Sequence, residues 1–254
     1  YLGGYPENVI EFYNIKKKFK CFLIEDACHA LGAKYLYNKK YLPVGSCKHA
    51  DISTFSLHPV KTITSAEGGL INTNNKFFYE KIIALRSHGI IKDKDFHWKY
   101  DIYKSGFNYR LSDLNSALGL SQLHKINKFI SYRKKIFNYY SRNLKKNNLI
   151  TFPIYKKNKP SYHLFLISIN FTRIDASKDK LLKFLRKNNI LCQYHYIPIY
   201  NFKFFSKKRK KHFYKGADYY YKNTLSLPIF FNLKLIFQKK IIKKINYFIK
   251  HFDK

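Results

Sequence analysis

The sequence predicts an α/β protein built in two parts. Segments with the apolar spacing of helices alternate with short apolar runs typical of buried strands, and this alternation indicates a sheet covered by helices. The chain has 254 residues, of which 46% are hydrophobic and 19% aromatic, so it can bury a substantial core. We expect a larger part at residues 1–146, which includes a long linking helix, and a smaller α/β domain at residues 147–254.

The larger part alternates helices and strands along the chain. Its predicted elements are, in order, a helix at 8–18, strands at 21–24, 51–56 and 69–73, and a helix at 77–86. Asn74 and Asn75 form the turn before that last helix. Ser112 is the expected N-cap of a long helix that runs to about residue 146, because a serine hydroxyl accepts a hydrogen bond from a free backbone N–H.

The smaller part repeats this mixture of elements. Its predicted elements are a strand at 162–169, a helix at 177–187, a strand at 192–196 and a terminal helix at 233–252. A second α/β unit follows from this order.

The chain is strongly basic, with a formal net charge of +34 at pH 7. Clustered lysines and arginines suit nucleic acid or an anionic membrane surface. Here the charge is spread along the chain, and Lys207–Lys211 is the one compact basic run, so we interpret the excess as a bias in residue usage. We therefore expect no nucleic-acid partner, and a basic nucleic-acid binder stays as an alternative supported by charge alone.

The cysteines and the hydropathy indicate a cytoplasmic protein without a metal site. Four cysteines occur, none in a CxxC pair, so free thiols in a reducing compartment are expected. The nearby cysteines and histidines at 28, 29, 47, 49 and 58 match no standard ligand spacing. No apolar run approaches the roughly 18 to 20 residues that span a bilayer, so we expect no membrane segment.

One lysine and one carboxylate occupy related places in the predicted sheet. The strand run at 21–24 ends in Glu25 and Asp26, and Lys61 lies in the loop after the strand at 51–56. Ligand-binding groups gather at the carboxyl ends of strands in such sheets, so both side chains can face one pocket. A lysine amine and a carboxylate are the groups that pyridoxal phosphate (PLP) chemistry requires from a protein: the amine forms a Schiff base, and the carboxylate keeps the pyridine nitrogen protonated.

Each of these residues alone has a simpler interpretation, as a helix cap or as a solvent-facing side chain. Two neighbouring features strengthen the chemical one. The Ser56 hydroxyl can donate to a phosphate, and Gly68 and Gly69 permit close approach of the backbone. The combination predicts a cofactor site around Lys61.

Ordered motifs extend this pattern along almost the whole chain. The first set is Glu-Asp-Ala-Cys-His-Ala-Leu-Gly-Ala from Glu25, Val-Gly-Ser from Val44, Phe-Ser-Leu-His-Pro-Val-Lys from Phe55, Glu-Gly-Gly from Glu67 and Leu-Arg-Ser-His-Gly-Ile from Leu85. The second set is Phe-Asn-Tyr-Arg-Leu-Ser-Asp from Phe107, Ala-Leu-Gly-Leu-Ser-Gln-Leu from Ala117, Tyr-His-Leu-Phe from Tyr162, His-Tyr-Ile-Pro from His195 and Leu-Ser-Leu-Pro from Leu225. Together these motifs resemble the DegT/DnrJ/EryC1/StrS family of sugar aminotransferases.

The resemblance implies a fold and an activity. The fold is that of the PLP-dependent transferases of fold type I, which are aspartate aminotransferase-like, with part of the large domain and the smaller C-terminal domain present here. The Cys28-His29 and His58-Pro59-Val60-Lys61 versions of the motifs most resemble the pseudaminic acid branch of the family. The implied reaction transfers an amino group, with glutamate as donor, to C4 of a UDP-4-keto-6-deoxy-N-acetylhexosamine, in a homodimer.

The resemblance also implies roles for individual residues. Lys61 is the Schiff-base lysine and the acid and base that moves the proton during the 1,3-shift. Asp26 holds the pyridinium nitrogen and Ser56 binds the cofactor phosphate. His29 contacts the cofactor ring or its phenolate oxygen, and Asn108 reaches the phosphate of the cofactor bound to the partner subunit.

Three further residues have implied substrate roles, namely Arg110, His163 and His195. Both histidines also have a plain interpretation as core or interface residues. A perosamine-type or other nucleotide-sugar 4-aminotransferase is an alternative reading of the same motifs. Relatives that catalyse dehydration carry a histidine in place of the Schiff-base lysine, so Lys61 argues against that reaction.

Two departures from the family pattern are visible. The chain begins with Tyr1 and contains no methionine, which predicts a fragment that lacks its natural N-terminus together with part of the phosphate cradle and the ring-stacking side chain. Ala66 stands where close relatives usually have glycine. A catalytically incompetent fragment or an interaction protein of the same fold is therefore a further alternative.

Overall fold

The computed structural model describes residues 1–155, 157–206 and 214–252. The chain divides into two compact units, the first made of Tyr1–Lys128 and Lys157–Ser161 and the second of Phe129–Lys156 and Tyr162–Lys254. The predicted basic run at 207–211 lies outside the described residues. Among the described helices, none is both long and apolar enough to cross a membrane.

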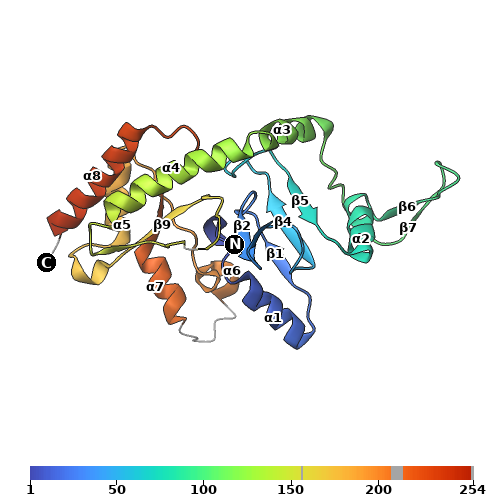
Figure 1. Ribbon diagram of the computed structural model, residues 1–254, viewed down its shortest axis with the longest axis horizontal. Coiled ribbons are helices and arrows are strands. Elements are labelled where there is room, and N and C mark those ends of the chain that lie inside the picture. Colours follow the sequence, from blue (N-terminus) through green and yellow to red (C-terminus); the bar gives the residue numbers. More distant parts are fainter. Residues whose placement is uncertain (156, 207–213, 253–254) are drawn as a thin grey trace. The chain divides into compact units, whose positions relative to one another are not determined.

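The first unit contains the predicted alternation of helix and strand (Figure 1). Its elements up to the second helix are η1 (Leu2–Gly4), α1 (Val9–Phe19), β1 (Ile24–Asp26), β2 (Lys34–Tyr37), β3 (Lys40–Pro43), β4 (Ile52–Ser56), β5 (Gly69–Asn72) and α2 (Lys76–Arg86). The predicted strands at 51–56 and 69–73 and the helices at 8–18 and 77–86 are confirmed within two residues. The strand predicted at 21–24 begins only at Ile24 and includes Asp26.

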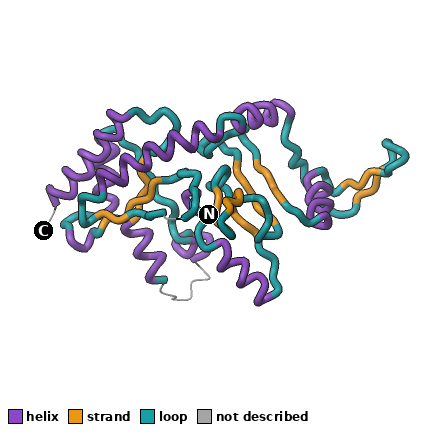
Figure 2. The backbone as a smooth tube through the Cα atoms, viewed as in Figure 1, coloured by secondary structure: helices purple, strands orange, loops and turns teal. Residues whose placement is uncertain are grey.

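Three strands of this unit form a mixed sheet in the order β1, β4, β5, drawn in orange in Figure 2. β1 and β4 are parallel, with Asp26 opposite Thr54. β4 and β5 are antiparallel, with Ser56 opposite Gly69. The carboxyl ends of β1 and β4 therefore lie at the same edge of the sheet.

Small residues let the loop after β1 pack closely on this sheet. Ala27, Ala30 and Ala33 are fully buried, and they share a core cluster with Val9, Tyr35, Val44 and Phe55. β2 and β3 form a hairpin whose turn residues, Asn38 and Lys39, both have left-handed backbone angles (φ 46° and 62°). Such a turn matches the twist of the paired strands.

The rest of the first unit is more exposed. Asn75 caps α2, because its side chain accepts from the N–H of Phe78 at 3.3 Å. Beyond α2, β6 (Ile90–Lys92) and β7 (Tyr100–Ile102) form a hairpin that extends away from that helix (Figure 1). Trp98 and Tyr100 on this hairpin are 63% and 64% exposed.

The predicted long helix is two helices, α3 (Asp113–Leu123) and α4 (Ile126–Leu144). Ser112 caps α3 as expected, since its hydroxyl accepts from the N–H of Asn115 at 3.2 Å. The break occurs where Lys125 donates its N–H to the carbonyl of Gln122, three residues back, at 2.9 Å. This tighter turn interrupts the four-residue spacing of an α-helix.

The second unit is built around an antiparallel sheet in the order β10, β9, β8. Its strands are β8 (Ile150–Thr151), β9 (Phe165–Ile169) and β10 (Thr224–Leu227), and its helices after α4 are η2 (Phe171–Arg173), α5 (Lys178–Lys187), η3 (Ile199–Asn201), α6 (Lys203–Ser206), α7 (Lys215–Asn223) and α8 (Leu235–Phe252). The predicted helices at 177–187 and 233–252 are confirmed. In place of the strand predicted at 192–196, the described residues show one isolated bridge, between Gln193 and Ser226.

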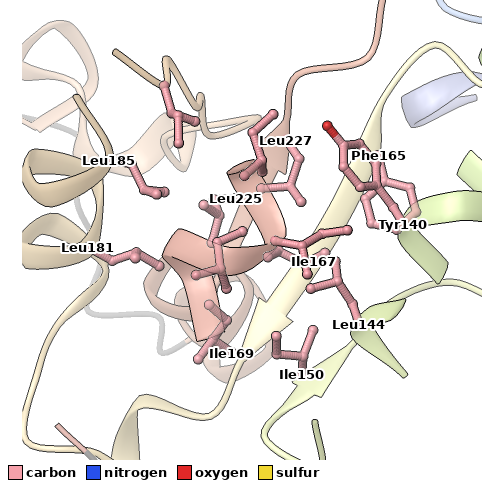
Figure 3. Close-up of a cluster of buried hydrophobic side chains, with 14 of the residues drawn as sticks. Tyr140, Leu144, Ile150, Phe165, Ile167, Ile169, Leu181, Leu185, Leu225 and Leu227 are labelled. Carbon is pink, nitrogen blue, oxygen red and sulfur yellow. The ribbon is translucent and has the colours of Figure 1, made fainter. Parts of the chain in front are cut away.

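Apolar side chains from these elements meet in one core, part of which Figure 3 shows. Phe165, Ile167 and Ile169 of β9 are fully buried, as are Leu181 and Leu185 one helical turn apart on α5. α4 contributes Ile136, Phe137, Tyr140 and Leu144 to the same core. The division between the compact units therefore falls at Phe129, within α4. The sequence predicted a domain boundary at residue 146, after the end of this helix, and that boundary stays a prediction.

Candidate active site

Asp26 is the last residue of β1, and its carboxylate is held by the turn that follows. The backbone N–H of Cys28 donates to Asp26 Oδ1 at 3.1 Å. This turn stays against the sheet because the N–H of Ala27 donates to the carbonyl of Thr54 in β4 at 2.9 Å. Hydrogen bonding from the Cys28 side chain is the main cause that lowers the pKa of Asp26, and nearby positive charge adds to it. The carboxylate is thus ionised at neutral pH.

Lys61 lies in a closed loop between β4 and β5. The N–H of Leu57 donates to the carbonyl of Gly68 at 2.8 Å, and the N–H of Ser65 donates to the carbonyl of Leu57 at 3.0 Å. At the tip, the N–H of Lys61 donates to the carbonyl of His58 at 2.9 Å. Thr62 and Ile63, which follow Lys61, are buried and anchor the loop on the unit.

The loop brings the lysine amine into range of the β1 carboxylate. Partial burial lowers the pKa of Lys61, and the nearby Cys28 and Asp26 groups oppose that shift. Burial raises the pKa of the Cys28 thiol, with a further contribution from Asp26, so this residue is a neutral thiol at pH 7. The site therefore combines an ionised carboxylate with an amine that loses its proton more readily than an ordinary lysine.

Small residues close the loop on its β5 side. A Cβ atom added at Gly68 would lie 2.5 Å from Ser65 Oγ, and one added at Gly69 would lie 2.9 Å from the carbonyl oxygen of Phe55. Ala66 has a left-handed φ of 65°, which costs a residue with a side chain about 1–2 kcal/mol. The alanine thus occupies a position that a glycine would fill without strain.

Ser56 and His29 complete the inner part of the predicted site. Ser56 ends β4, and its Oγ accepts from the N–H of His58 at 3.4 Å. His29 is buried, its Nδ1 accepts from the N–H of Gly3 at 3.2 Å, and its carbonyl accepts from the Ser161 hydroxyl at 2.6 Å. His29 is also close enough for its charge to affect Asp26. The structure thus brings His29 and Lys61 to Asp26, and puts Ser56 at the end of the strand beside β1.

Asn108 and Arg110 belong to the same unit but have exposed side chains. The backbone of Asn108 bridges to Ser87, and the N–H of Tyr109 donates to the carbonyl of Arg86 at 2.9 Å. Gly89 fits this crossing tightly, since a Cβ there would lie 1.5 Å from the carbonyl oxygen of Lys104. The segment is therefore fixed by its backbone while its polar side chains face outward.

His163 and His195 are in the second unit, and their substrate roles stay predictions. His163 is buried, and its carbonyl accepts from Arg133 Nη1 at 3.1 Å. His195 Nδ1 lies 3.0 Å from Ser226 Oγ. The backbone of His163 and the ring of His195 thus make contacts within that unit.

The sequence did not single out Cys28 as a contact of Asp26. Its position two residues after a strand-ending aspartate is the available signal, because such an aspartate often accepts from the N–H two residues on. A second unnoticed pair is His58 and Glu67, whose Nε2 and Oε1 atoms are 3.8 Å apart at the exposed rim of the Lys61 loop. In the described part of the chain, no group of three or more metal-binding side chains occurs.

Comparison with known proteins identifies close relatives. Residues 1–246 match the DegT/DnrJ/EryC1/StrS aminotransferase family. A UDP-4-amino-4,6-dideoxy-N-acetyl-beta-L-altrosamine transaminase from Campylobacter jejuni is 40% identical over 227 residues, which are 89% of this chain and 58% of that protein. A Helicobacter pylori protein of the same name is 38% identical over 235 residues, which are 92% of this chain and 60% of that protein. The chain thus spans less than two thirds of the length of these relatives.

Solved structures agree with this result. Helicobacter pylori PseC, described as an aminotransferase involved in the biosynthesis of pseudoaminic acid, superimposes with a TM-score of 0.89 at 33% identity, covering 99% of this chain and 66% of PseC. The protein Spr1654 from Streptococcus pneumoniae, solved in a pyridoxamine phosphate form, matches with a TM-score of 0.84 at 23% identity and supports the fold alone. These matches confirm the α/β fold of type I that the motifs implied. The chain belongs to the DegT/DnrJ/EryC1/StrS aminotransferase family.

Proposed function

We propose that this chain carries the lysine-bearing part of a PLP-dependent nucleotide-sugar aminotransferase. The proposed reaction moves an amino group from glutamate to C4 of a UDP-4-keto-6-deoxy-N-acetylhexosamine in pseudaminic acid biosynthesis. The observation that carries the proposal is the pairing of Lys61, whose pKa is lowered, with the ionised Asp26 at the adjoining end of a parallel strand. The choice of sugar substrate in this proposal comes from the names of the relatives.

The residues present fit PLP in charge and in donor type. When bound, this cofactor supplies an aldehyde that combines with amines and a ring that accepts electrons. Asp26 offers a carboxylate for the protonated ring nitrogen, and its second role as acceptor from Cys28 fixes its rotation. The Ser56 hydroxyl suits the phosphate, since its oxygen accepts from the N–H of His58 and its O–H can act as the donor.

Lys61 has two tasks in this proposal. Its amine must be neutral to attack an aldehyde, and the lowered pKa increases the neutral fraction at any pH below the usual lysine value. Its Nζ then carries the proton between the cofactor carbon and the substrate carbon. The short closed loop around it limits the positions that Nζ can reach, which favours transfer along one path.

The remaining site residues keep, in this proposal, the roles that the family resemblance implies. Asn108 is assigned to the phosphate of a partner subunit's cofactor, and its outward side chain on a fixed backbone supports a homodimer. Arg110, His163 and His195 are assigned to the substrate. Cytoplasmic location is proposed from the cysteines, all four of which have free thiols.

A product assay tests this function. The natural gene product that carries this sequence is incubated with PLP, glutamate and UDP-4-keto-6-deoxy-N-acetylhexosamines, and the products are identified by mass spectrometry. We expect the mass of the 4-amino sugar with the wild type and none with Lys61→Ala. Failure of the wild type to aminate any such sugar would defeat the assignment and leave the inert-fragment alternative.

One relative favours a second candidate sugar. A GDP-perosamine synthase from Escherichia coli O157:H7 is 31% identical over 212 residues, which are 84% of this chain. A GDP-linked 4-keto-6-deoxyhexose is therefore included in the same assay. Amination of this sugar in preference to the UDP-linked ones selects the perosamine-type reaction.

A further inference from the structure

A short segment of the chain enters the first unit from the second. Residues 157–161 belong to the first unit, whereas the residues that precede and follow them belong to the second. The segment pairs with the start of β2, because the N–H of Lys34 donates to the carbonyl of Lys159 and the N–H of Lys159 donates to the carbonyl of Lys34, both at 2.8 Å. Residues 157–161 are called the crossing segment below.

The last residue of the crossing segment, Ser161, binds the loop that follows β1. Ser161 is fully buried, and its hydroxyl donates to the carbonyl of His29 at 2.6 Å. Its own N–H donates to the carbonyl of Gly4 at 3.1 Å, which fixes the serine in turn. Loss of a buried hydrogen-bond partner costs more than loss of an exposed one, so this contact is a firm anchor for the loop.

The loop has a second anchor, and the N–H that holds Asp26 lies between the two. At its start, the N–H of Ala27 donates to a carbonyl of β4 at 2.9 Å, and the N–H of Ala30 donates back to the carbonyl of Ala27 at 2.8 Å. This turn contains Cys28, whose N–H donates to Asp26 Oδ1 at 3.1 Å. A donor N–H orients a carboxylate and favours its ionised form. The direction of this N–H therefore depends on the sheet on one side and on the crossing segment on the other.

We propose that Ser161 is a positioning residue for Asp26. Its hydroxyl holds the carbonyl of His29, and this contact keeps the turn in place from which the Cys28 N–H orients the Asp26 carboxylate. The inference rests on the proposed PLP site and deepens it, because it adds a residue 135 positions along the chain from Asp26. Ser161 acts through the loop alone in this scheme, and proton transfer is left to Lys61.

Two variants of the crossing segment separate this role from general support of the fold. Ser161→Ala removes the hydrogen bond to the loop after β1. Asn158→Ala is the matched control in the same segment, because its side chain accepts from the N–H of Leu36 at 2.9 Å and donates to the carbonyl of Pro6 at 2.7 Å. Urea denaturation of the natural gene product establishes that both variants are folded under the conditions used below.

Titration with PLP, followed by absorbance, tests the effect on Asp26. We expect Ser161→Ala to raise the dissociation constant roughly 3- to 10-fold, the effect of one lost hydrogen bond, and Asn158→Ala to leave it unchanged. In an Asp26→Asn background, Ser161→Ala should have no further effect, since residues that act through one contact are not additive. Equal affinity of Ser161→Ala and wild type, equal weakening by both variants, or an undiminished effect in the Asp26→Asn background would overturn the proposal.

Amide hydrogen exchange of the protein without cofactor tests the anchor separately. We expect the Ala30 N–H to exchange roughly 3- to 10-fold faster in Ser161→Ala and at the wild-type rate in Asn158→Ala. An unchanged rate in Ser161→Ala would overturn the anchor. If the wild type bound no PLP, the proposed function would fail, and this comparison would still decide the anchor.

The wild type alone gives a third test, which applies even if Ser161→Ala does not fold. Coupling between two sites is reciprocal, so a contact that strengthens PLP binding must itself be strengthened when PLP binds. We therefore expect saturating PLP to slow exchange of the Ser161 N–H roughly 3- to 10-fold. Exchange at Ser161 that is the same with and without bound PLP would refute the coupling.

Discussion

The loop that carries Lys61 depends on a glycine at position 68, and replacing it by alanine is a sharp test of that loop. An added Cβ would lie 2.5 Å from Ser65 Oγ and 2.9 Å from Leu111 Cδ1. Distances below 3.0 Å require a neighbour to shift. Ser65 is fully buried and its hydroxyl donates to the carbonyl of Glu67 at 3.0 Å, so the nearer neighbour cannot move without losing a hydrogen bond.

The expected cost follows from overpacking. Extra atoms in a well-packed site destabilise by about 1–3 kcal/mol, and the lost Ser65 hydrogen bond accounts for about 0.5–1.5 kcal/mol of this. We therefore expect Gly68→Ala to lower the free energy of unfolding by about 1–3 kcal/mol. Gly216→Ala is the matched control, because nothing lies within 4 Å of its added Cβ and it sits in helix α7. There the same change should stabilise by about 0.4–1 kcal/mol.

Urea denaturation followed by circular dichroism measures both changes. Amide hydrogen exchange then locates the effect, since the N–H of Leu57 donates to the carbonyl of Gly68 and should lose protection only in Gly68→Ala. An unfolding free energy for Gly68→Ala equal to or above that of the wild type would show that the loop is looser than described. Destabilisation by Gly216→Ala of the same size would remove the argument from local packing.

Two further predictions concern the charged groups of the site. Asp26→Asn removes the charge that we assign to the cofactor ring nitrogen. The dissociation constant for PLP should therefore rise roughly 10- to 150-fold, which corresponds to the loss of a charge-assisted hydrogen bond of about 1.5–3 kcal/mol. An unchanged dissociation constant in an absorbance titration would exclude this contact. The pKa of Lys61 is lowered by burial, so the rate at which the apo protein captures PLP should rise with pH to a midpoint below the usual lysine value of about 10.4, and a midpoint at or above that value would contradict the burial argument. The folded protein binds fewer protons at Lys61 than the unfolded chain, so the contribution of this residue to stability rises with pH across the same window.

Local signals predicted the first sheet well. The helix at 8–18 and the strands at 51–56 and 69–73 have clear periodicity and turn residues at their ends, and the structure confirms them. The cap at Ser112 follows from its side-chain oxygen alone, and Asn75 was predicted as part of the turn before α2, which it caps. These features depend on residues within four positions of each other, which is why the sequence reveals them.

Long-range pairings escaped the sequence. In the part of the chain that the structure describes, the segment at 192–196 pairs with β10 at Gln193 alone, through Ser226, which is 33 residues further along the chain. The break between α3 and α4 contains neither proline nor glycine, so no breaker marks it. Whether an apolar segment becomes a strand depends on the strand that pairs with it, and the sequence of the segment does not identify that neighbour.

The candidate site shows the same division. Asp26 and Lys61 were expected to share a pocket because each follows a strand, and the parallel pairing of β1 with β4 gives that expectation a physical basis. The contact between Cys28 and Asp26 was missed although it joins residues only two positions apart, which a strand-ending aspartate could have indicated. The hydrogen bond that His29 Nδ1 accepts also comes from a backbone N–H 26 residues upstream.

Identification of the lysine that binds the cofactor tests the central claim most directly. The natural gene product is mixed with PLP, reduced with borohydride and digested, and the modified peptide is identified by mass spectrometry. We expect the added mass on Lys61, retained in the control Lys76→Ala, whose exposed amine is paired with Glu80 at 3.9 Å, and lost in Lys61→Ala. Modification of a different lysine, or labelling that persists unchanged in Lys61→Ala, would contradict the assignment of Lys61 as the catalytic amine.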